Sequence, residues 1–219
     1  MKSKYRGATL GPVNDISKSI ATGRLICVVG PSGAGKDSVI GYARDHLPPG
    51  SPVVFARRTI TRPAESGGED HEAVSEQDFA RLLREEEFAL HWHANGLSYG
   101  IRKELYAWLE AGMTVVMSGS RQHLPDLLAG FPRAEIVHIV APLQVLRKRL
   151  SQRGRERPEQ IERRLQRALL FGEPRPGERT IANSGVLATA GEALLSVIAA
   201  ATPSTALRDD ILCQMRQDN

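Results

Sequence analysis

Short apolar runs alternate with amphipathic segments along most of this chain. The runs at 25–29, 114–117 and 135–140 are rich in β-branched residues, which is typical of strands buried on both faces of a parallel sheet. Helical patterns follow at about 37–44, 103–111, 143–152, 158–170 and 192–200. Because parallel strands need long crossovers, this alternation predicts an α/β fold, with a parallel sheet covered by helices on both faces.

The region from about 57 to 101 breaks the alternation. A predicted strand over 52–58 leads into a polar loop over 64–72, after which Ser75 has the features of a helix N-cap. Two short strands then flank Asn95-Gly96, which is a strong hairpin signal. We expect this region to form a small substrate-binding lobe inserted into the main domain.

The main domain is expected to span residues 23–202, with a short strand at 180–183 on the edge of the sheet. Residues 1–22 show no clear hydrophobic period, and we interpret them as a poorly ordered extension. Residues 203–219 are interpreted as a tail.

A glycine-rich stretch connects the first predicted strand to the first predicted helix. Residues 30–36 read Gly-Pro-Ser-Gly-Ala-Gly-Lys, which is the arrangement of a phosphate-binding loop. Glycines let successive backbone N–H groups point at phosphates, and Lys36 can reach the β- and γ-phosphates. The predicted nucleotide-binding residues are Gly30, Pro31, Ser32, Gly33, Ala34, Gly35, Lys36, Asp37 and Ser38.

One position departs from the usual loop. The residue after the lysine is normally Ser or Thr, whose hydroxyl binds Mg²⁺, but here it is Asp37. A carboxylate is also a hard oxygen ligand, so Asp37 is the candidate metal ligand.

Arginines cluster between 147 and 167. Most charge runs on helices are solvated surfaces. Arg153 and Arg164 are stronger candidates, because Arg153-Gly154 separates two helices that follow the last core strand. A hinged helix pair there can close over transferring phosphates. We interpret about 150–165 as an arginine-rich lid, and Arg153 and Arg164 as catalytic residues together with Lys36 and Asp37.

The basic composition suggests anionic ligands, and a mildly basic solvated surface is the alternative interpretation. The formal net charge is +4, while only 5% of residues are aromatic and no basic tract is interleaved with aromatic residues, which disfavours nucleic acid. The two cysteines lack the spacing of a disulfide framework or a metal site. No run approaches the ~20 apolar residues that span a bilayer. We therefore expect a cytoplasmic protein without membrane or nucleic-acid partners.

Several stretches resemble the guanylate kinase family, over about residues 24–190. They are the loop at 30–36, Thr-Ile-Thr-Arg-Pro at 59–63, Asn-Gly-Leu-Ser-Tyr-Gly at 95–100, Arg153-Gly154, and Ile-Glu-Arg-Arg-Leu at 161–165. The resemblance implies a P-loop kinase fold with a core, a lobe for the phosphate acceptor and an arginine-bearing lid. It also implies ATP and Mg²⁺ as cofactors.

The resemblance further implies roles for individual residues. Arg62 would hold the phosphate of the acceptor, Tyr99 matches one phosphate-binding tyrosine of the family, and His71 stands where the family has another. Arg58 is a further candidate for the same substrate site. Asn183 would lie near the adenine of ATP.

Two departures from the family are informative. Guanylate kinases read guanine with a glutamate, and Leu90 stands at that position here. Leucine cannot accept hydrogen bonds, and a site that loses such a partner discriminates strongly, so GMP is not the expected substrate. Ser118 replaces a family aspartate. We hypothesise that Asp37 and Ser118 have exchanged roles, with Asp37 on the metal and Ser118 supplying a hydrogen bond.

Within the superfamily, the chain resembles a branch that acts on a sugar bisphosphate. The matching features include Gly-Lys-Asp-Ser at 35–38, the His-Trp hairpin at 91–100 and Asn183-Ser-Gly. This branch transfers the γ-phosphoryl group of ATP to the 1-phosphate of ribose 1,5-bisphosphate, in phosphonate degradation. His91 and His93 could each donate to a substrate phosphate, and an exposed hairpin histidine is an equally open interpretation of each.

Two other functions remain open at this point. One is a nucleoside monophosphate kinase of altered base specificity. The other is an inactive module that binds phosphorylated peptides, although such modules typically lose the phosphate loop that this chain keeps. The oligomeric state is also open, a homodimer included.

Overall fold

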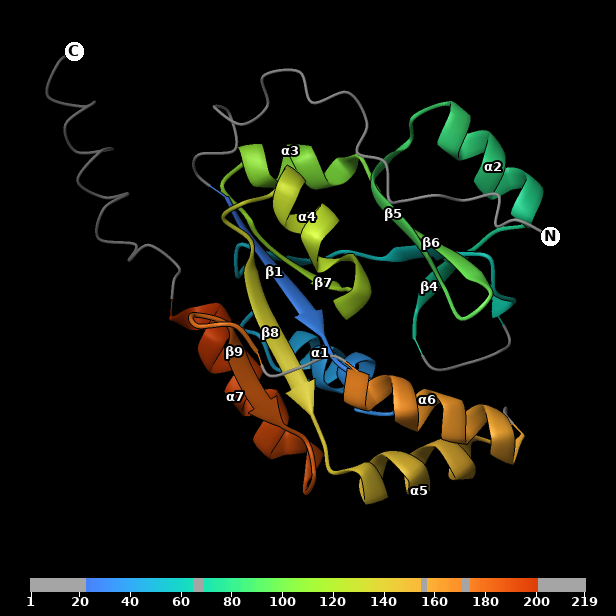
Figure 1. Cartoon of the computed structure of the whole chain (residues 1–219). Helices are drawn as coiled ribbons and strands as arrows, with labels where there is room; N and C mark the ends of the chain where they lie inside the picture. Colours follow the sequence, from blue (N-terminus) through green and yellow to red (C-terminus); the bar gives the residue numbers. More distant parts are fainter. Residues whose placement is uncertain (1–22, 65–68, 155–156, 171–173, 201–219) are drawn as a thin grey trace, which may run out of the picture.

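The computed structural model describes residues 23–64, 69–154, 157–170 and 174–200, and in them the chain forms two sheets flanked by helices (Figure 1). The predicted extension over 1–22 and the predicted tail over 203–219 lie outside the described residues.

The strands are β1 (Arg24–Val29), β2 (Val53–Phe55), β3 (Arg58–Ile60), β4 (His71–Ala73), β5 (Phe88–Ala94), β6 (Leu97–Arg102), β7 (Thr114–Ser118), β8 (Glu135–Val140) and β9 (Arg179–Ala182). The helices are α1 (Lys36–Asp45), α2 (Glu76–Arg84), α3 (Glu104–Glu110), the 3₁₀ turn η3 (Arg121–His123), α4 (Leu124–Gly130), α5 (Leu143–Arg153), α6 (Pro158–Leu170) and α7 (Leu187–Ala199).

Five strands form the main sheet, in the order β2-β7-β1-β8-β9, and every pairing is parallel. The central strands carry the apolar runs because both of their faces are covered. The strands predicted at 25–29, 114–117 and 135–140 and the edge strand predicted at 180–183 are confirmed.

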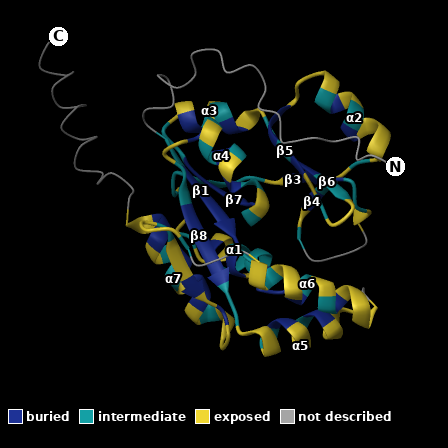
Figure 2. Cartoon of the chain, viewed as in Figure 1, coloured by how far each residue is buried: buried dark blue, intermediate teal, exposed yellow. Residues whose placement is uncertain are grey.

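Alternate residues of β1 enter two separate cores, as the two-residue period of a strand requires. Leu25, Cys27 and Val29 pack with apolar residues of α3 and α4, whereas Ile26 and Val28 pack with those of α1, α5, α6 and α7. Figure 2 shows the buried strands between these helical layers. The predicted α/β fold, with helices on both faces of a parallel sheet, is therefore confirmed.

The second sheet is smaller, with the strand order β4-β3-β6-β5. Its hairpin of β5 and β6 turns at Asn95 and Gly96, both with positive φ (54° and 79°), as a tight hairpin turn requires. Helix α2 begins after Ser75, whose side chain accepts a hydrogen bond from the backbone N–H of Asp78. The predicted hairpin and N-cap are confirmed.

Three local predictions were wrong. The single strand expected over 52–58 is two strands in different sheets, because β2 pairs with β7 and β3 pairs with β6. The polar loop expected over 64–72 ends in β4, which pairs with β3. The last helix begins at Leu187 rather than 192. The three-residue strands β2, β3 and β4 depend on tertiary partners rather than on a local pattern.

Helices α5 and α6 form a pair next to the phosphate loop, and we call them the lid helices (Figure 1). Gly154, in the left-handed conformation with φ 63°, ends α5. Leu146 and Leu150 of α5 pack with Ile161 and Leu165 of α6 in the core of the main domain. Among the described helices, none is long and apolar enough to cross a membrane.

Candidate active site

The loop between β1 and α1 has the backbone shape that its glycines allow. Gly30 and Gly35 have φ of 155° and 84°, a region that other residues rarely adopt. A Cβ atom at Gly30 would lie 2.3 Å from the carbonyl oxygen of Ile139, and one at Gly35 would lie 2.5 Å from Nδ2 of Asn183. Only glycine therefore fits at these two positions.

Lys36 is the first residue of α1 and folds back over the loop. Its Nζ donates to the carbonyl oxygens of Gly30 (3.1 Å) and Pro31 (3.4 Å). Burial lowers the pKa of the Lys36 ammonium to about 8, a shift that the neighbouring Asp37 carboxylate partly opposes. Burial, rather than the balance of the charges around it, is thus the main cause of the shift in the pKa of Lys36.

The loop forms one wall of a cavity of about 260 Å³. The lid helices, the small sheet and the residues after β7 supply the other walls. Seven basic side chains line it: Lys36, Arg58, Arg62, Arg121, Arg153, Arg164 and Arg167. Two acidic side chains, Asp37 and Glu69, line it as well. This imbalance of charge fits ligands with several phosphate groups.

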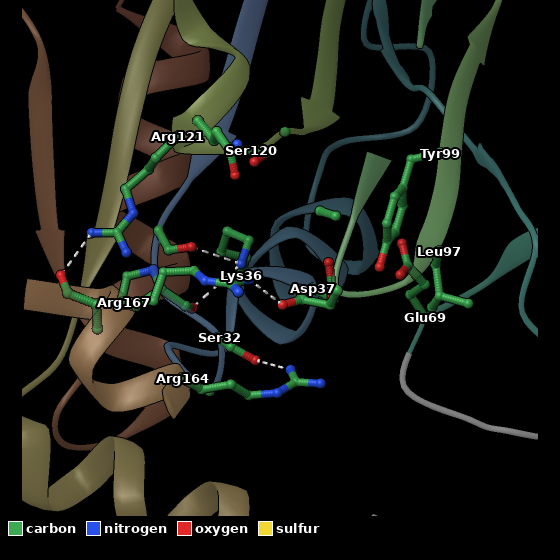
Figure 3. A pocket seen from close by; sticks show the side chains of 18 of the residues that line it. Ser32, Lys36, Asp37, Glu69, Leu97, Tyr99, Ser120, Arg121, Arg164 and Arg167 are labelled. Atoms are coloured by element: carbon green, nitrogen blue, oxygen red, sulfur yellow. Dashed lines mark hydrogen bonds between the residues drawn. The ribbon is translucent and has the colours of Figure 1, made fainter. Parts of the chain in front are cut away.

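Figure 3 shows side chains that line the cavity from two sides. Glu69, Leu97 and Tyr99 lie on one side, Arg121, Arg164 and Arg167 on the other, and Lys36 and Asp37 between them. We call these the acceptor side and the lid side.

On the acceptor side, two arginines share one carboxylate. Arg58 donates to both oxygens of Glu69, from Nε (2.7 Å) and Nη2 (2.5 Å), and Arg62 donates to Oε1 of Glu69 (3.2 Å). The guanidinium of Arg58 also lies over the ring of Tyr99, which stacks on Trp92. The Nε atom of Arg62 is buried and has no hydrogen-bond partner among the described residues.

Asp37 connects the phosphate loop to both sheets. Its Oδ1 accepts from the hydroxyl of Ser118, at the end of β7 (3.1 Å), and from Nη2 of Arg58, on β3 (3.4 Å). Asp37 and Ser118, which we hypothesise from the sequence to have exchanged roles, are therefore in direct contact.

On the lid side, α6 touches the phosphate loop directly. Arg164 donates to the hydroxyl of Ser32 (2.7 Å), and Arg167 donates to the side-chain oxygen of Asn95, in the hairpin turn (2.7 Å). Arg121 donates to the carbonyl of Ala168, and burial lowers the pKa of its guanidinium. The lid helices therefore contact both the loop and the small sheet.

A second cavity, of about 360 Å³, opens beside the start of α1. Gly35, Ser38, Arg153 and Asn183 are among the residues that line it. Asn183 donates from Nδ2 to the carbonyl of Ala34 (2.7 Å), which ties the segment after β9 to the phosphate loop. Arg153 lines both cavities and so marks where they meet.

Most of the predicted site residues come together, but the three histidines do not line the main cavity. His71 is buried, with its ring between the carbonyls of Glu69 and Arg62. His91 lines a separate small cavity beside Leu90. His93 is exposed, with Nδ1 3.5 Å from the hydroxyl of Ser98.

Several cavity residues were missed from the sequence, among them the charged or aromatic side chains Glu69, Trp92, Arg121 and Arg167. Glu69 lies in a segment interpreted as a polar loop, and its partner Arg58 lies 11 residues earlier, on β3. Arg121 begins a 3₁₀ turn that was not predicted, and Arg167 was grouped with surface arginines. The loop contains several acidic residues, so its sequence does not single out Glu69.

The phosphate loop, the parallel sheet and the basic cavity define a P-loop kinase of the guanylate kinase type. The chain belongs to the guanylate kinase family, whose model, described as guanylate kinase, matches residues 22–170. A guanylate kinase from Anaplasma phagocytophilum has the same fold, with a TM-score of 0.60 and 17% identity over 84% of this chain and 88% of that one.

Two curated relatives are more similar in sequence. Both are named ribose 1,5-bisphosphate phosphokinase PhnN. The protein from Thiobacillus denitrificans is 43% identical over 84% of this chain and 97% of its own length. The protein from Chromobacterium violaceum is 49% identical over 80% of this chain and 92% of its own length.

Proposed function

We propose that this protein transfers the γ-phosphoryl group of ATP to the 1-phosphate of ribose 1,5-bisphosphate, which forms 5-phosphoribosyl 1-diphosphate. The observation that carries the proposal is the excess of basic side chains in the main cavity, seven against two acidic ones. A small sugar with two phosphates beside ATP supplies the matching negative charge. The names of the relatives from T. denitrificans and C. violaceum support this acceptor.

The phosphate loop and the second cavity suit ATP. The backbone N–H groups of the loop and the ammonium of Lys36 would hold its phosphates, and Asn183 and Ser38 line the space for its nucleoside. ATP would supply the phosphoryl group, and Mg²⁺, when bound, would neutralise phosphate charge.

Asp37 is the residue that we propose for the metal. Its Oδ1 is engaged by Ser118 and Arg58, so Oδ2 is the oxygen that would face Mg²⁺. The described residues contain no group of three or more potential metal ligands. The remaining ligands would therefore be phosphate oxygens and water, as is usual for Mg²⁺.

The acceptor side would position the nucleophile. A phosphate oxygen is already ionised at neutral pH, so the reaction needs no strong general base, and positioning with charge neutralisation carries the catalysis. Arg62 would bind the 1-phosphate, and its buried Nε would gain an acceptor. Tyr99 and Arg58 border the same space.

The lid side would act on the transferring group. Arg164 lies against the phosphate loop through Ser32, and Arg153 lies where the two cavities meet. Their planar guanidinium groups would neutralise charge that develops on the phosphoryl oxygens. Helix α6 over the cavity would also limit the entry of water, which competes with the acceptor.

A nucleoside monophosphate kinase is less well supported. Leu90 is buried and lines a small cavity of about 20 Å³ with His91, and it offers no acceptor to the N–H groups of guanine. Because ATP is the donor, we place the enzyme in the cytoplasm.

A coupled assay of ADP release tests the proposal. Ribose 1,5-bisphosphate and GMP are compared as acceptors, with ATP and Mg²⁺ in both reactions. We expect kcat/KM for the sugar to exceed that for GMP by at least ~100-fold, because a site without the base-reading group discriminates strongly. Comparable turnover of GMP would support the nucleoside monophosphate kinase instead. No turnover of either by folded protein would support the binding module.

A further inference from the structure

Glu69 places a negative charge where the acceptor's phosphate is expected to bind. Its side chain is 11% exposed, lines the main cavity and is hydrogen-bonded to Arg58 and Arg62. A carboxylate beside a phosphate costs binding energy through repulsion. Its presence among the phosphate-binding arginines therefore points to a second task.

The hydrogen bonds of Glu69 leave room for one more donor. Oε1 accepts from Nη2 of Arg58 and Nη2 of Arg62, whereas Oε2 accepts from Nε of Arg58. An ionised carboxylate oxygen can accept two hydrogen bonds, so Oε2 has capacity for another. The two arginines hold the carboxylate in place, since a bidentate pair fixes both position and plane.

We propose that Glu69 accepts a hydrogen bond from the sugar hydroxyl next to the phosphate-bearing carbon, and so selects the 1-phosphate of a ribosyl substrate as the acceptor. The inference rests on the proposed function. A phosphate on Arg62 lies beside Glu69, because the two side chains are hydrogen-bonded. In a ribose 1-phosphate, the adjacent carbon carries the 2-hydroxyl, which can donate to the carboxylate.

The same carboxylate rejects other phosphates. The phosphate of a nucleoside 5′-monophosphate sits on a methylene whose neighbouring carbon carries the ring oxygen, so no hydroxyl lies beside it. Glu69 then repels the phosphate without gaining a hydrogen bond. The 5-phosphate of ribose 1,5-bisphosphate has the same disadvantage, so Glu69 also determines which end of the sugar faces ATP.

If Glu69 has only a structural role, its replacement should not change the preference for one substrate over another. Glu72 is a matched control for this possibility. Glu72 pairs with Arg102 through two hydrogen bonds, from Nη2 (2.6 Å) and Nε (3.0 Å), in the same sheet. Glu72 is not among the residues that line the main cavity. If Glu69 only braces the sheet, both carboxylates should behave alike.

The test measures kcat/KM for ribose 1,5-bisphosphate and for its 2-deoxy analogue, in the wild type and in the variants Glu69→Gln and Glu72→Gln. We expect the wild type to prefer the ribose compound by about 10- to 100-fold, the usual contribution of a hydrogen bond to a charged group. Glu69→Gln should lower this preference at least fivefold, because glutamine lacks the charge. Glu72→Gln should keep the preference of the wild type.

Each other outcome has a distinct meaning. An unchanged preference in Glu69→Gln, or an equal loss in both variants, overturns the role of Glu69 and leaves the proposed function standing. No turnover of ribose 1,5-bisphosphate by the wild type overturns the proposed function and this inference together. Thermal melting checks that the variants fold. If Glu69→Gln does not fold, Glu69→Asp replaces it in the test. Aspartate keeps the charge but is shorter by one methylene, so we expect the same loss of preference for the ribose compound over its 2-deoxy analogue.

Discussion

The two sides of the cavity hold their arginines in different ways. On the acceptor side, Arg58 lies on β3 and Arg62 lies two residues after the end of this strand, and both contact the Glu69 carboxylate. On the lid side, Arg164 and Arg167 lie on one helix and contact a hydroxyl and an amide oxygen. The contacts of the acceptor side join two ionised groups, whereas only the arginine is ionised in the contacts of the lid side.

This difference separates two tasks. We propose that the acceptor side, whose arginines are held by Glu69, selects and orients the acceptor. The lid side contacts neutral oxygens, and we propose that it responds to the charge of ATP and of the transferring group. We therefore expect changes on the acceptor side to alter selectivity, and changes at the loop and lid to alter rate.

The largest expected loss of kcat follows from a change at Lys36, which lies between the two sides of the cavity (Figure 3). Lys36→Ala should lower kcat about 1000-fold, because it removes the cation nearest the phosphates. Steady-state kinetics and the melting temperature measure rate and folding separately. Lys103→Ala, which removes an exposed lysine outside the cavity, serves as the control. A variant of Lys36 with near wild-type kcat would contradict the role of the loop.

The lid side is tested by neighbouring arginines on α6. Arg164→Ala should lower kcat about 100-fold with a smaller change in KM for the sugar, because its charge acts mainly on the developing transition state. Arg163, the preceding residue, is exposed and does not line the cavity. Arg163→Ala should therefore keep nearly full activity, and equal losses in the two variants would argue against a specific role.

The contact of Asp37 with Ser118 allows a test of exchanged roles. Asp37→Ser should raise the Mg²⁺ concentration needed for half-maximal activity about 10- to 100-fold, because a carboxylate ligand is lost. Asp37→Ser combined with Ser118→Asp should reverse part of this increase. Activity measured against Mg²⁺ concentration tests both variants. Full activity of Asp37→Ser at limiting Mg²⁺ would rule the exchange out.

The smallest effect concerns pH. The pKa of Lys36 is about 8 without ligand, and phosphates favour its charged form. Below pH 8 the lysine is already charged, so affinity for ADP should change little. Above pH 8 binding requires uptake of a proton, so affinity should fall up to about tenfold per pH unit. Calorimetric titration from pH 6.5 to 9.5 measures this, and Lys36→Ala should lack the transition.

The core and the phosphate loop could be predicted because their signals are local. Residues 25–36 combine a buried strand with a turn that glycine alone permits, and the pattern is contiguous. The Asn95-Gly96 turn was predictable for the same reason. By contrast, β3 and β4 are three-residue strands, and pairing across the small sheet decides their position.

The acceptor side was only partly predictable. Arg62 and Tyr99 could be found through family motifs, whereas Glu69 becomes significant only when folding brings it to Arg58. Helix α4 has seven residues, with a proline in its first turn, so its hydrophobic period is too short to detect. The sequence therefore did not predict α4, and Arg121, in the 3₁₀ turn before it, was missed as well.

The most direct test of the central claim is the ³¹P NMR spectrum of the product that the wild type forms from ribose 1,5-bisphosphate and ATP. Our account predicts a diphosphate whose sugar-linked phosphorus couples to the single proton on C1, together with an unchanged 5-phosphate monoester. A diphosphate coupled to the two methylene protons on C5 would mean that the sugar binds in the reverse orientation, and would contradict the account.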